Sequence, residues 1–180
     1  MAHRQIDPAD PTGEFPIDPA GYFLHLMLII NRRRDARVEQ LLRPLNMTVD
    51  GHRAMRIIHI RSACTMGELA DYAIIDRTTL TRIVDRLVSD GLVDRSKPPG
   101  DRRKIVLTLT ESGLEAYNRA RRVIGRFNVE LTRGLDEADF RIAARLQQRI
   151  VARVVEDEEL AQRLMLLEGD AKPKSGRGRA

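Results

Sequence analysis

The chain has 180 residues, a formal net charge of +5 and a single cysteine. A chain of this length can bury roughly 70% of its unfolded surface, so it needs neither disulfides nor a metal to fold. Its longest nearly apolar run, Tyr22 to Ile30, is interrupted by His25 and falls far short of the roughly 20 residues that a membrane span requires. We therefore expect a soluble cytoplasmic protein, and the lone thiol of Cys64 agrees with a reducing compartment.

The positive charge is unevenly distributed. Residues 171–180 hold four basic side chains and no acid, so this tail supplies +4 of the net +5. Residues 77–104 hold eight basic against four acidic side chains, which concentrates another +4 on one predicted surface. Local clustering, rather than net charge, indicates where nucleic-acid phosphates would be bound.

Residues 1–17 are rich in proline and poor in apolar side chains, which predicts a mobile arm. Asp18 then has the position of an N-cap, with Pro19 as the first helical residue, and the helix should run to about Leu42. From Tyr22 to Ile30 this helix is apolar on nearly all sides, which predicts burial on several sides. A partner subunit would supply that burial.

Three shorter helices should follow. Thr48 is placed to cap the first, and the segment Thr65-Met66-Gly67-Glu68 has the pattern of a capping box that starts the second. Asp76 should cap the third, which Gly91 ends. Five apolar side chains should form the small core between the last two helices: Leu69, Ala73, Ile75, Leu80 and Ile83.

The remaining chain predicts a hairpin and two long helices. The strands should cover residues 92–96 and 104–109, with an exposed turn between them. Thr110 should cap a long helix that Gly134 ends, and Asp136 should start a final helix that continues through Leu160. Residues 169–180 are predicted to be a disordered basic tail. The fold class is thus mainly α, an α+β arrangement with a winged helix-turn-helix.

The second helix of the helix-turn-helix presents a polar outer face. Its members are Arg77, Thr78, Thr79, Thr81, Arg82 and Arg86. An α-helix fits the major groove of DNA, short hydroxyls permit close approach, and arginines can fork to guanine or bind phosphate. The alternative is a solvated helix face with ordinary charges, but the hairpin that follows favours double-stranded DNA as the partner.

The tip of the hairpin is the second candidate DNA contact. Asp101 and Arg103 are two residues apart and can lie on one side of the ribbon, with Arg102 between them. A carboxylate beside an arginine can hold the guanidinium extended, ready to enter a narrow minor groove. The alternative is a surface ion pair with almost no effect on stability.

Several motifs occur together in an order that resembles the multiple-antibiotic-resistance regulator (MarR) family across roughly residues 18–165. They are Met47-Thr48 with Arg53, Gly67–Ala70, Asp76–Leu87, Asp90–Val93 and Asp101–Gly113. The resemblance implies a homodimer, with residues 18–46 and 111–168 as a helical dimerisation domain and residues 47–110 as the DNA-binding lobe. It also implies a recognition helix in the major groove, a wing arginine in the minor groove, and repression of transcription from a pseudo-palindromic operator.

The sequence departs from the family pattern at two positions. Ile74 stands where such turns usually carry glycine, and a β-branched residue disfavours positive φ. This turn is therefore either built differently or strained. His52 stands where the family commonly has an aromatic residue, which would alter the pocket between the dimer helices and the lobe.

A small aromatic anion is the effector that this pocket would suit. The candidate residues are Tyr22, His25, His52, Arg53 and Arg56, because effector pockets are mostly apolar with a few convergent polar groups. Two alternatives stay open. Arg53 and Arg56 would instead pair with acids such as Asp50 and brace the lobe, and His25 would be a hydrogen-bonded core histidine.

Other classes of function find less support. No phosphate-binding loop or nucleophile–base signature is present, so we expect no enzyme and no cofactor. His52 and His59 lie about 10 Å apart along one helix face, too far to share a metal. Cys64 has no adjacent basic residue to stabilise a thiolate, which favours a buried structural thiol over a redox-responsive regulator. A non-specific architectural DNA-binding protein remains the other alternative.

Overall fold

The computed structural model describes residues 18–97 and 104–166. The predicted N-terminal arm (1–17), the hairpin tip (98–103) and the basic tail (169–180) lie outside these residues. The helices are α1 (Pro19–Leu42), the short 3-10 helix η1 (Arg43–Leu45), α2 (Val49–Arg61), α3 (Met66–Ala73), α4 (Arg77–Ser89), α5 (Glu111–Leu131), α6 (Glu137–Val154) and α7 (Glu158–Leu166). The strands are β1 (Cys64–Thr65), β2 (Val93–Ser96) and β3 (Val106–Leu109).

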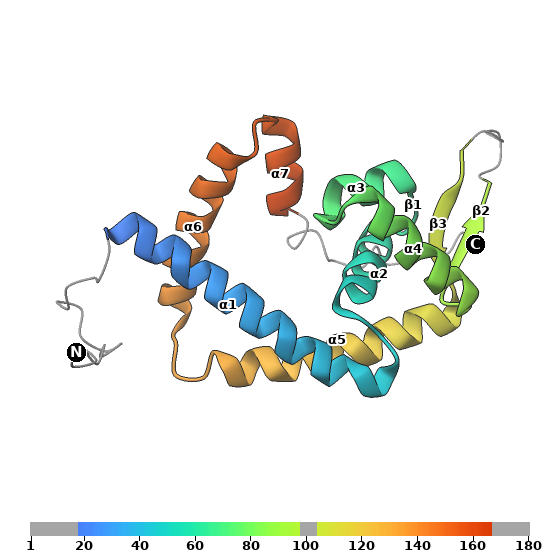
Figure 1. The fold of residues 1–180 in the computed structure, drawn as a ribbon, viewed down its shortest axis with the longest axis horizontal. Helices are drawn as coiled ribbons and strands as arrows, with labels where there is room; N and C mark the ends of the chain where they lie inside the picture. Colours follow the sequence, from blue (N-terminus) through green and yellow to red (C-terminus); the bar gives the residue numbers. More distant parts are fainter. Residues whose placement is uncertain (1–17, 98–103, 167–180) are drawn as a thin grey trace, which may run out of the picture.

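The fold is mainly helical, with a winged helix-turn-helix lobe joined to long flanking helices, as predicted. Figure 1 shows α2, α3, α4 and the sheet gathered at one end, while α1 and α5 run from that end toward α6. Helix α5 packs against both α1 and α2 and so connects the two parts.

Local capping chemistry sets the start of most helices. Asp18, Thr48, Asp76 and Thr110 each accept a hydrogen bond from the backbone N–H three residues on, at 2.8–3.0 Å. The capping box at Thr65 is complete, since its hydroxyl and the Glu68 carboxylate each accept from the other residue's backbone N–H. All five predicted N-caps are therefore confirmed.

The sheet differs from the predicted two-stranded hairpin. A third strand, β1, pairs with β3 in the antiparallel order β1-β3-β2. The two predicted strands are also shorter than expected, because the Leu92 N–H bonds the carbonyl of Leu87 and closes α4, and β3 begins only at Val106. Gly113 is required at this corner, since a Cβ there would lie 1.9 Å from the Leu92 carbonyl oxygen.

Two helix ends were predicted wrongly. Helix α5 stops at Leu131, before Gly134, because the next N–H, that of Arg133, bonds the carbonyl of Glu130 three residues back and leaves the α-helical pattern. The predicted final helix is broken in two, since Val155 is extended and Asp157 accepts a hydrogen bond from the N–H of Leu160 at 2.9 Å. Asp157 thereby caps a separate helix, α7.

The core lies in the lobe and in the ends of α1 and α5 that touch it. Its largest fully buried side chains are Leu42, Met55, Ile58, Leu69, Leu80 and Leu107. The predicted helix-turn-helix core is confirmed, with Leu69, Ala73 and Leu80 buried and Ile75 and Ile83 packed against them. By contrast, α6 contributes no buried residue, and α1 contributes only Val38 and Leu42.

Of the two alternatives for the turn at Ile74, a different construction or a strained backbone, the structure shows the strained backbone. It ends α3 with φ 52° and ψ 38°, in the left-handed region, and its side chain is 86% exposed. Left-handed backbone costs a β-branched residue roughly 1–2 kcal/mol, and so exposed a side chain recovers little of this by packing.

We predict that Ile74→Gly raises the free energy of unfolding by about 1 kcal/mol, the relieved strain less the extra entropy of an unfolded glycine. The midpoint temperature should rise by about 2–4 °C. Urea and thermal unfolding at fixed protein concentration measure both. Ile74→Val is the control, because it keeps the β-branch and the strain; equal stability of the two variants would contradict the prediction.

Candidate nucleic-acid interface

Helix α4 is divided into a buried side and an exposed side. Leu80, Val84 and Leu87 are buried against α2 and α3. All six predicted contact residues are exposed: Arg77, Thr78, Thr79, Thr81, Arg82 and Arg86. The structure therefore brings these side chains together on one open helix face, although the Thr81 hydroxyl also donates to the Arg77 carbonyl at 2.9 Å.

Arg86 is held in place by two neighbours. Its Nη2 lies 3.4 Å from Asn46 Oδ1 and its Nε lies 3.6 Å from Asp90 Oδ2. Beside it, a cleft of about 220 Å³ separates the start of α2 from α4, with Met47, Ile83 and Leu87 among its apolar lining residues. The tether reduces the rotamer freedom that a flexible arginine would lose on binding a phosphate.

The wing is tied to the recognition helix by an ion pair that the sequence analysis missed. Arg95 of β2 donates to the Asp85 carboxylate of α4 at 2.5 Å. The only feature of the sequence that could have predicted this ion pair is the opposite charge of two residues ten positions apart, on either side of the turn between helix and strand. Asp101, Arg102 and Arg103, the predicted wing contacts, lie outside the described residues.

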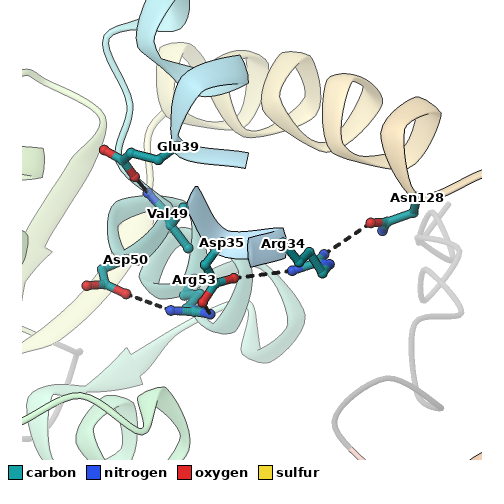
Figure 2. A network of polar contacts seen from close by, with 7 residues as sticks. All are labelled: Arg34, Asp35, Glu39, Val49, Asp50, Arg53 and Asn128. Atoms are coloured by element: carbon teal, nitrogen blue, oxygen red, sulfur yellow. Dashed lines mark hydrogen bonds and ion pairs between the residues drawn. The ribbon is translucent and has the colours of Figure 1, made fainter. Parts of the chain in front are cut away.

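A polar network fixes the lobe on the long helices (Figure 2). Arg53 of α2 bonds Asp35 of α1 at 2.6 Å and Asp50 of its own helix at 2.9 Å. Burial opposes the charge of Arg53, but the hydrogen bonds to both acids outweigh it and raise its pKa. Arg53 thus braces the lobe, as the alternative interpretation held, and both of its carboxylate partners come from the chain itself.

The same network reaches α5 and the start of α2. Arg34 of α1 donates to the Asn128 side chain of α5 at 3.2 Å, and Glu39 accepts from the backbone N–H of Val49 at 2.8 Å. Figure 2 shows that Arg34, before Asp35 in α1, and Glu39, after it, make these contacts. The C-terminal half of α1 is therefore the element on which both α2 and α5 are positioned.

His52 is packed rather than paired. Its ring stacks on Tyr117 with centroids 5.5 Å apart, and His59 contacts the same tyrosine at 4.8 Å. The His52 Nε2 atom is buried with no hydrogen-bond partner among the described residues. Burial, followed by the nearby charges of Arg56, Arg34 and Arg53, lowers the pKa of His52 to about 4. His52 is consequently neutral at pH 7 and cannot attract a carboxylate as a cation.

The other predicted effector residues are separated within one chain. Tyr22 and His25 lie on the N-terminal half of α1, ten or more residues before Asp35, which contacts Arg53. At 1.5 Å per residue this separation is roughly 15–20 Å. His25 is exposed, so the interpretation as a core histidine is wrong for the chain described here.

Cys64 does not have the surroundings of a redox sensor. Its side chain is 1% exposed, and burial raises the pKa of the thiol to about 11, with a further contribution from Glu68. A thiol that stays protonated at neutral pH is a poor nucleophile. In residues 18–97 and 104–166, no cluster of three or more potential metal ligands exists, and no helix is long and apolar enough to cross a membrane.

An exposed recognition helix seated on a short helix and flanked by a β-hairpin defines a DNA-binding transcription regulator of the winged helix-turn-helix class. The family model of the MarR family matches residues 47–105. The multiple antibiotic resistance protein MarR of Escherichia coli K12 is 30% identical over 120 residues, which cover 66% of this chain and 81% of that protein. The chain belongs to the MarR family.

Two further comparisons agree. The homoprotocatechuate degradative operon repressor of Escherichia coli is 41% identical over 75 residues, covering 42% of this chain and 51% of the repressor. The crystal structure of a cysteine-to-serine mutant of Escherichia coli MarR complexed with operator DNA superposes with a TM-score of 0.64. Its sequence is 28% identical, and the match covers 74% of this chain and 94% of that one.

The low pKa of His52 predicts a specific pH dependence of stability. An unfolded histidine binds a proton near pH 6.5, whereas His52 in the folded chain binds one only near pH 4. Its contribution to stability is therefore present above pH 6.5 and is lost as the pH falls toward 4, by about 3 kcal/mol at most.

His52→Phe keeps a stacked ring but cannot titrate. We expect its unfolding free energy, measured in urea, to fall less than that of the wild type between pH 7 and pH 4. His25→Gln is the control, since it removes an exposed imidazole. Parallel pH curves for wild type and His52→Phe would show that the burial of His52 has no such effect.

Proposed function

We propose that the protein is a homodimeric repressor that binds a pseudo-palindromic operator. The observation that carries this proposal is the exposed polar face of α4, with Arg86 pre-positioned beside it. Each subunit would place α4 in a major groove and its wing, including Arg103, in the adjacent minor groove. Residues 47–110 would form this DNA-binding lobe. The relative crystallised with operator DNA supports operator DNA as the partner.

The dimerisation domain would consist of residues 18–46 and 111–168. Its proposed interface follows from large apolar side chains that the single chain leaves exposed on α1 and α6. They are Leu24, Leu26, Leu28, Ile29, Ile30, Phe140, Ile142, Leu146 and Val154. An apolar surface of this extent on two long helices is typical of an obligate interface between identical subunits.

We predict a stable dimer that reads two half-sites about one helical turn, ~34 Å, apart. Leu28→Glu combined with Leu146→Glu should produce monomers, because each places charge in the proposed interface. Sedimentation velocity at micromolar concentration measures the change. Ile74→Glu, at an exposed apolar residue of the DNA-binding lobe, is the matched control. A wild type that sediments as a monomer would remove the basis for the proposed operator geometry.

We predict that Arg103→Ala weakens operator binding by about 1–3 kcal/mol without unfolding the protein. Asp101→Ala should weaken it less, because the arginine loses its orientation.

Arg86→Ala should weaken binding to all duplexes alike. The slope of the logarithm of the binding constant against the logarithm of salt concentration should fall by about one unit, as expected for a phosphate contact. Gel-shift titration with an operator selected from a random library tests all three. Equal affinity for selected and scrambled duplex would indicate a non-specific architectural protein.

We further propose that a small aromatic anion binds between the dimerisation helices and the lobe and releases the DNA. The relative named for homoprotocatechuate degradation supports an aromatic acid as the chemical class. Arg56, whose charge acts on the neighbouring His52 ring, is the favoured candidate for the anionic group. Tyr22 and His25 would reach such a pocket from α1 of the partner subunit.

Calorimetric titration with benzoates, hydroxycinnamates and their thioesters tests this proposal. An effector must bind the DNA-incompetent dimer more tightly, and by linkage operator DNA must weaken effector binding by the same factor. We expect Arg56→Gln to reduce affinity for the effector and to leave operator binding intact. Binding that is indifferent to operator, or no binding across the panel, would contradict an effector of this class.

A further inference from the structure

Thr81 lies on the exposed face of α4 with the proton of its hydroxyl already engaged inside the helix. The Thr81 Oγ1 atom lies 2.9 Å from the carbonyl oxygen of Arg77, and because a carbonyl can only accept, the hydroxyl is the donor. A hydroxyl carries one proton to donate and lone pairs with which it accepts. While this bond holds, Thr81 offers a partner outside the chain only an acceptor.

The engaged proton limits the groups of DNA that Thr81 can contact. Phosphate oxygens are hydrogen-bond acceptors, and so are guanine N7 and O6 and thymine O4 in the major groove. None of them can bond to an oxygen that offers only lone pairs. The donors that bases present in this groove are two amino groups, N6 of adenine and N4 of cytosine. A hydroxyl in this state therefore matches a base and not the DNA backbone.

The row of side chains that contains Thr81 faces the wing. Arg77, Thr81 and Asp85 follow one another at intervals of four residues, so they lie along one side of α4. Asp85 pairs with Arg95 of β2, which places this side of the helix toward the wing. The Asp85 carboxylate is a second acceptor one turn beyond Thr81 and disfavours a phosphate there. Thr81 itself stands in the second turn of α4, within the N-terminal part with which a recognition helix reaches base edges.

Thr78 provides a contrast on the same helix. Its backbone N–H bonds to the Asp76 carboxylate, but its hydroxyl makes no hydrogen bond within residues 18–97 and 104–166. The side chain is exposed and its hydroxyl can either donate or accept. Thr78 and Thr81 therefore form a matched pair, in which only the second has its hydroxyl proton engaged within the described chain.

We propose that Thr81 accepts a hydrogen bond from the amino group of an adenine or a cytosine in the major groove and so selects one base pair of each operator half-site. Every base pair carries one such amino group, on adenine or on cytosine. Thr81 would thus read the strand on which this group lies, so that adenine or cytosine at one position is accepted and guanine or thymine is rejected. This assignment rests on the proposed function, because α4 must enter the major groove of an operator.

The first test determines the sequence preference of the full-length protein by selection from a random duplex library and sequencing. The wild type should prefer adenine or cytosine over guanine or thymine at one position of each half-site. Thr81→Val keeps the shape of the side chain and nearly its helix propensity but cannot accept a hydrogen bond. The preference should therefore be lost, a change of about two- to tenfold, the range for one neutral hydrogen bond. Thr81→Ser should retain the preference, and so should the matched control Thr78→Val.

The other outcomes of the selection separate a backbone contact from a base contact. If Thr81→Val binds all duplexes more weakly by one factor, Thr81 contacts the backbone and the proposal is overturned. It is also overturned if Thr81→Val keeps the preference, or if Thr78→Val loses it as well. A wild type that selects no sequence would instead refute the proposed operator binding, and this assignment with it. A wild type that selects an operator leaves that function standing, whatever Thr81 does.

The second test removes the amino group from the DNA. Purine in place of the selected adenine, or 2-pyrimidinone in place of the selected cytosine, should weaken binding of the wild type by about two- to tenfold and should not weaken that of Thr81→Val. Gel-shift titration of both proteins with both duplexes forms a double-mutant cycle, which cancels any general effect of the modified base on the duplex. Equal weakening of both proteins would show that another residue contacts the amino group and would overturn the assignment.

Discussion

The contact between Arg53 and Asp35 is the interaction on which the arrangement of this molecule depends. It joins α2, the first helix of the lobe, to α1. The residue before Asp35, Arg34, joins α1 to Asn128 of α5. The Arg53–Asp35 pair is partly buried, so solvent screens it less than a surface pair, and its 2.6 Å length is that of a charge-assisted hydrogen bond. Since α1 and α6 also carry the exposed apolar surface, this contact sets where the lobe stands relative to any partner subunit.

The lobe is packed as one unit. Its core is continuous from α2 to β3, and Asp85–Arg95 joins the recognition helix to the wing. Arg86 is tethered at the other end of the same helix by Asn46 and Asp90. These contacts leave α4 little freedom to change its position within the lobe, so in the proposed dimer DNA affinity would depend mainly on the distance and angle between the two lobes.

The sequence predicted the features that depend on neighbouring residues, such as helix N-caps. It did not predict those that depend on residues far apart in the chain. N-caps depend on a side chain and a backbone N–H three residues away, which is why Asp18, Thr48, Asp76 and Thr110 were found. Strand β1 is only two residues long and pairs with β3. So short a segment cannot show the alternation of apolar and polar residues by which a strand is predicted from sequence. For Arg53, the sequence offered the neighbour Asp50, whereas the stronger partner, Asp35, is 18 residues away on another helix.

The residues at the junction between α1, α2 and α5 indicate where a change of lobe position would originate. His52 is neutral, and its Nε2 lacks a hydrogen-bond partner within the described chain. The charges of Arg34, Arg53 and Arg56 all act on its ring, so positive groups gather at this junction beside Asp35 and Asp50. A ligand that removes DNA must bind one lobe position better than another, because equal affinity shifts no equilibrium. An anion at this junction would compete with Asp35 for the same guanidinium groups. It would thereby loosen the contact that holds α2 on α1, and a rigid lobe would move as a body rather than unfold.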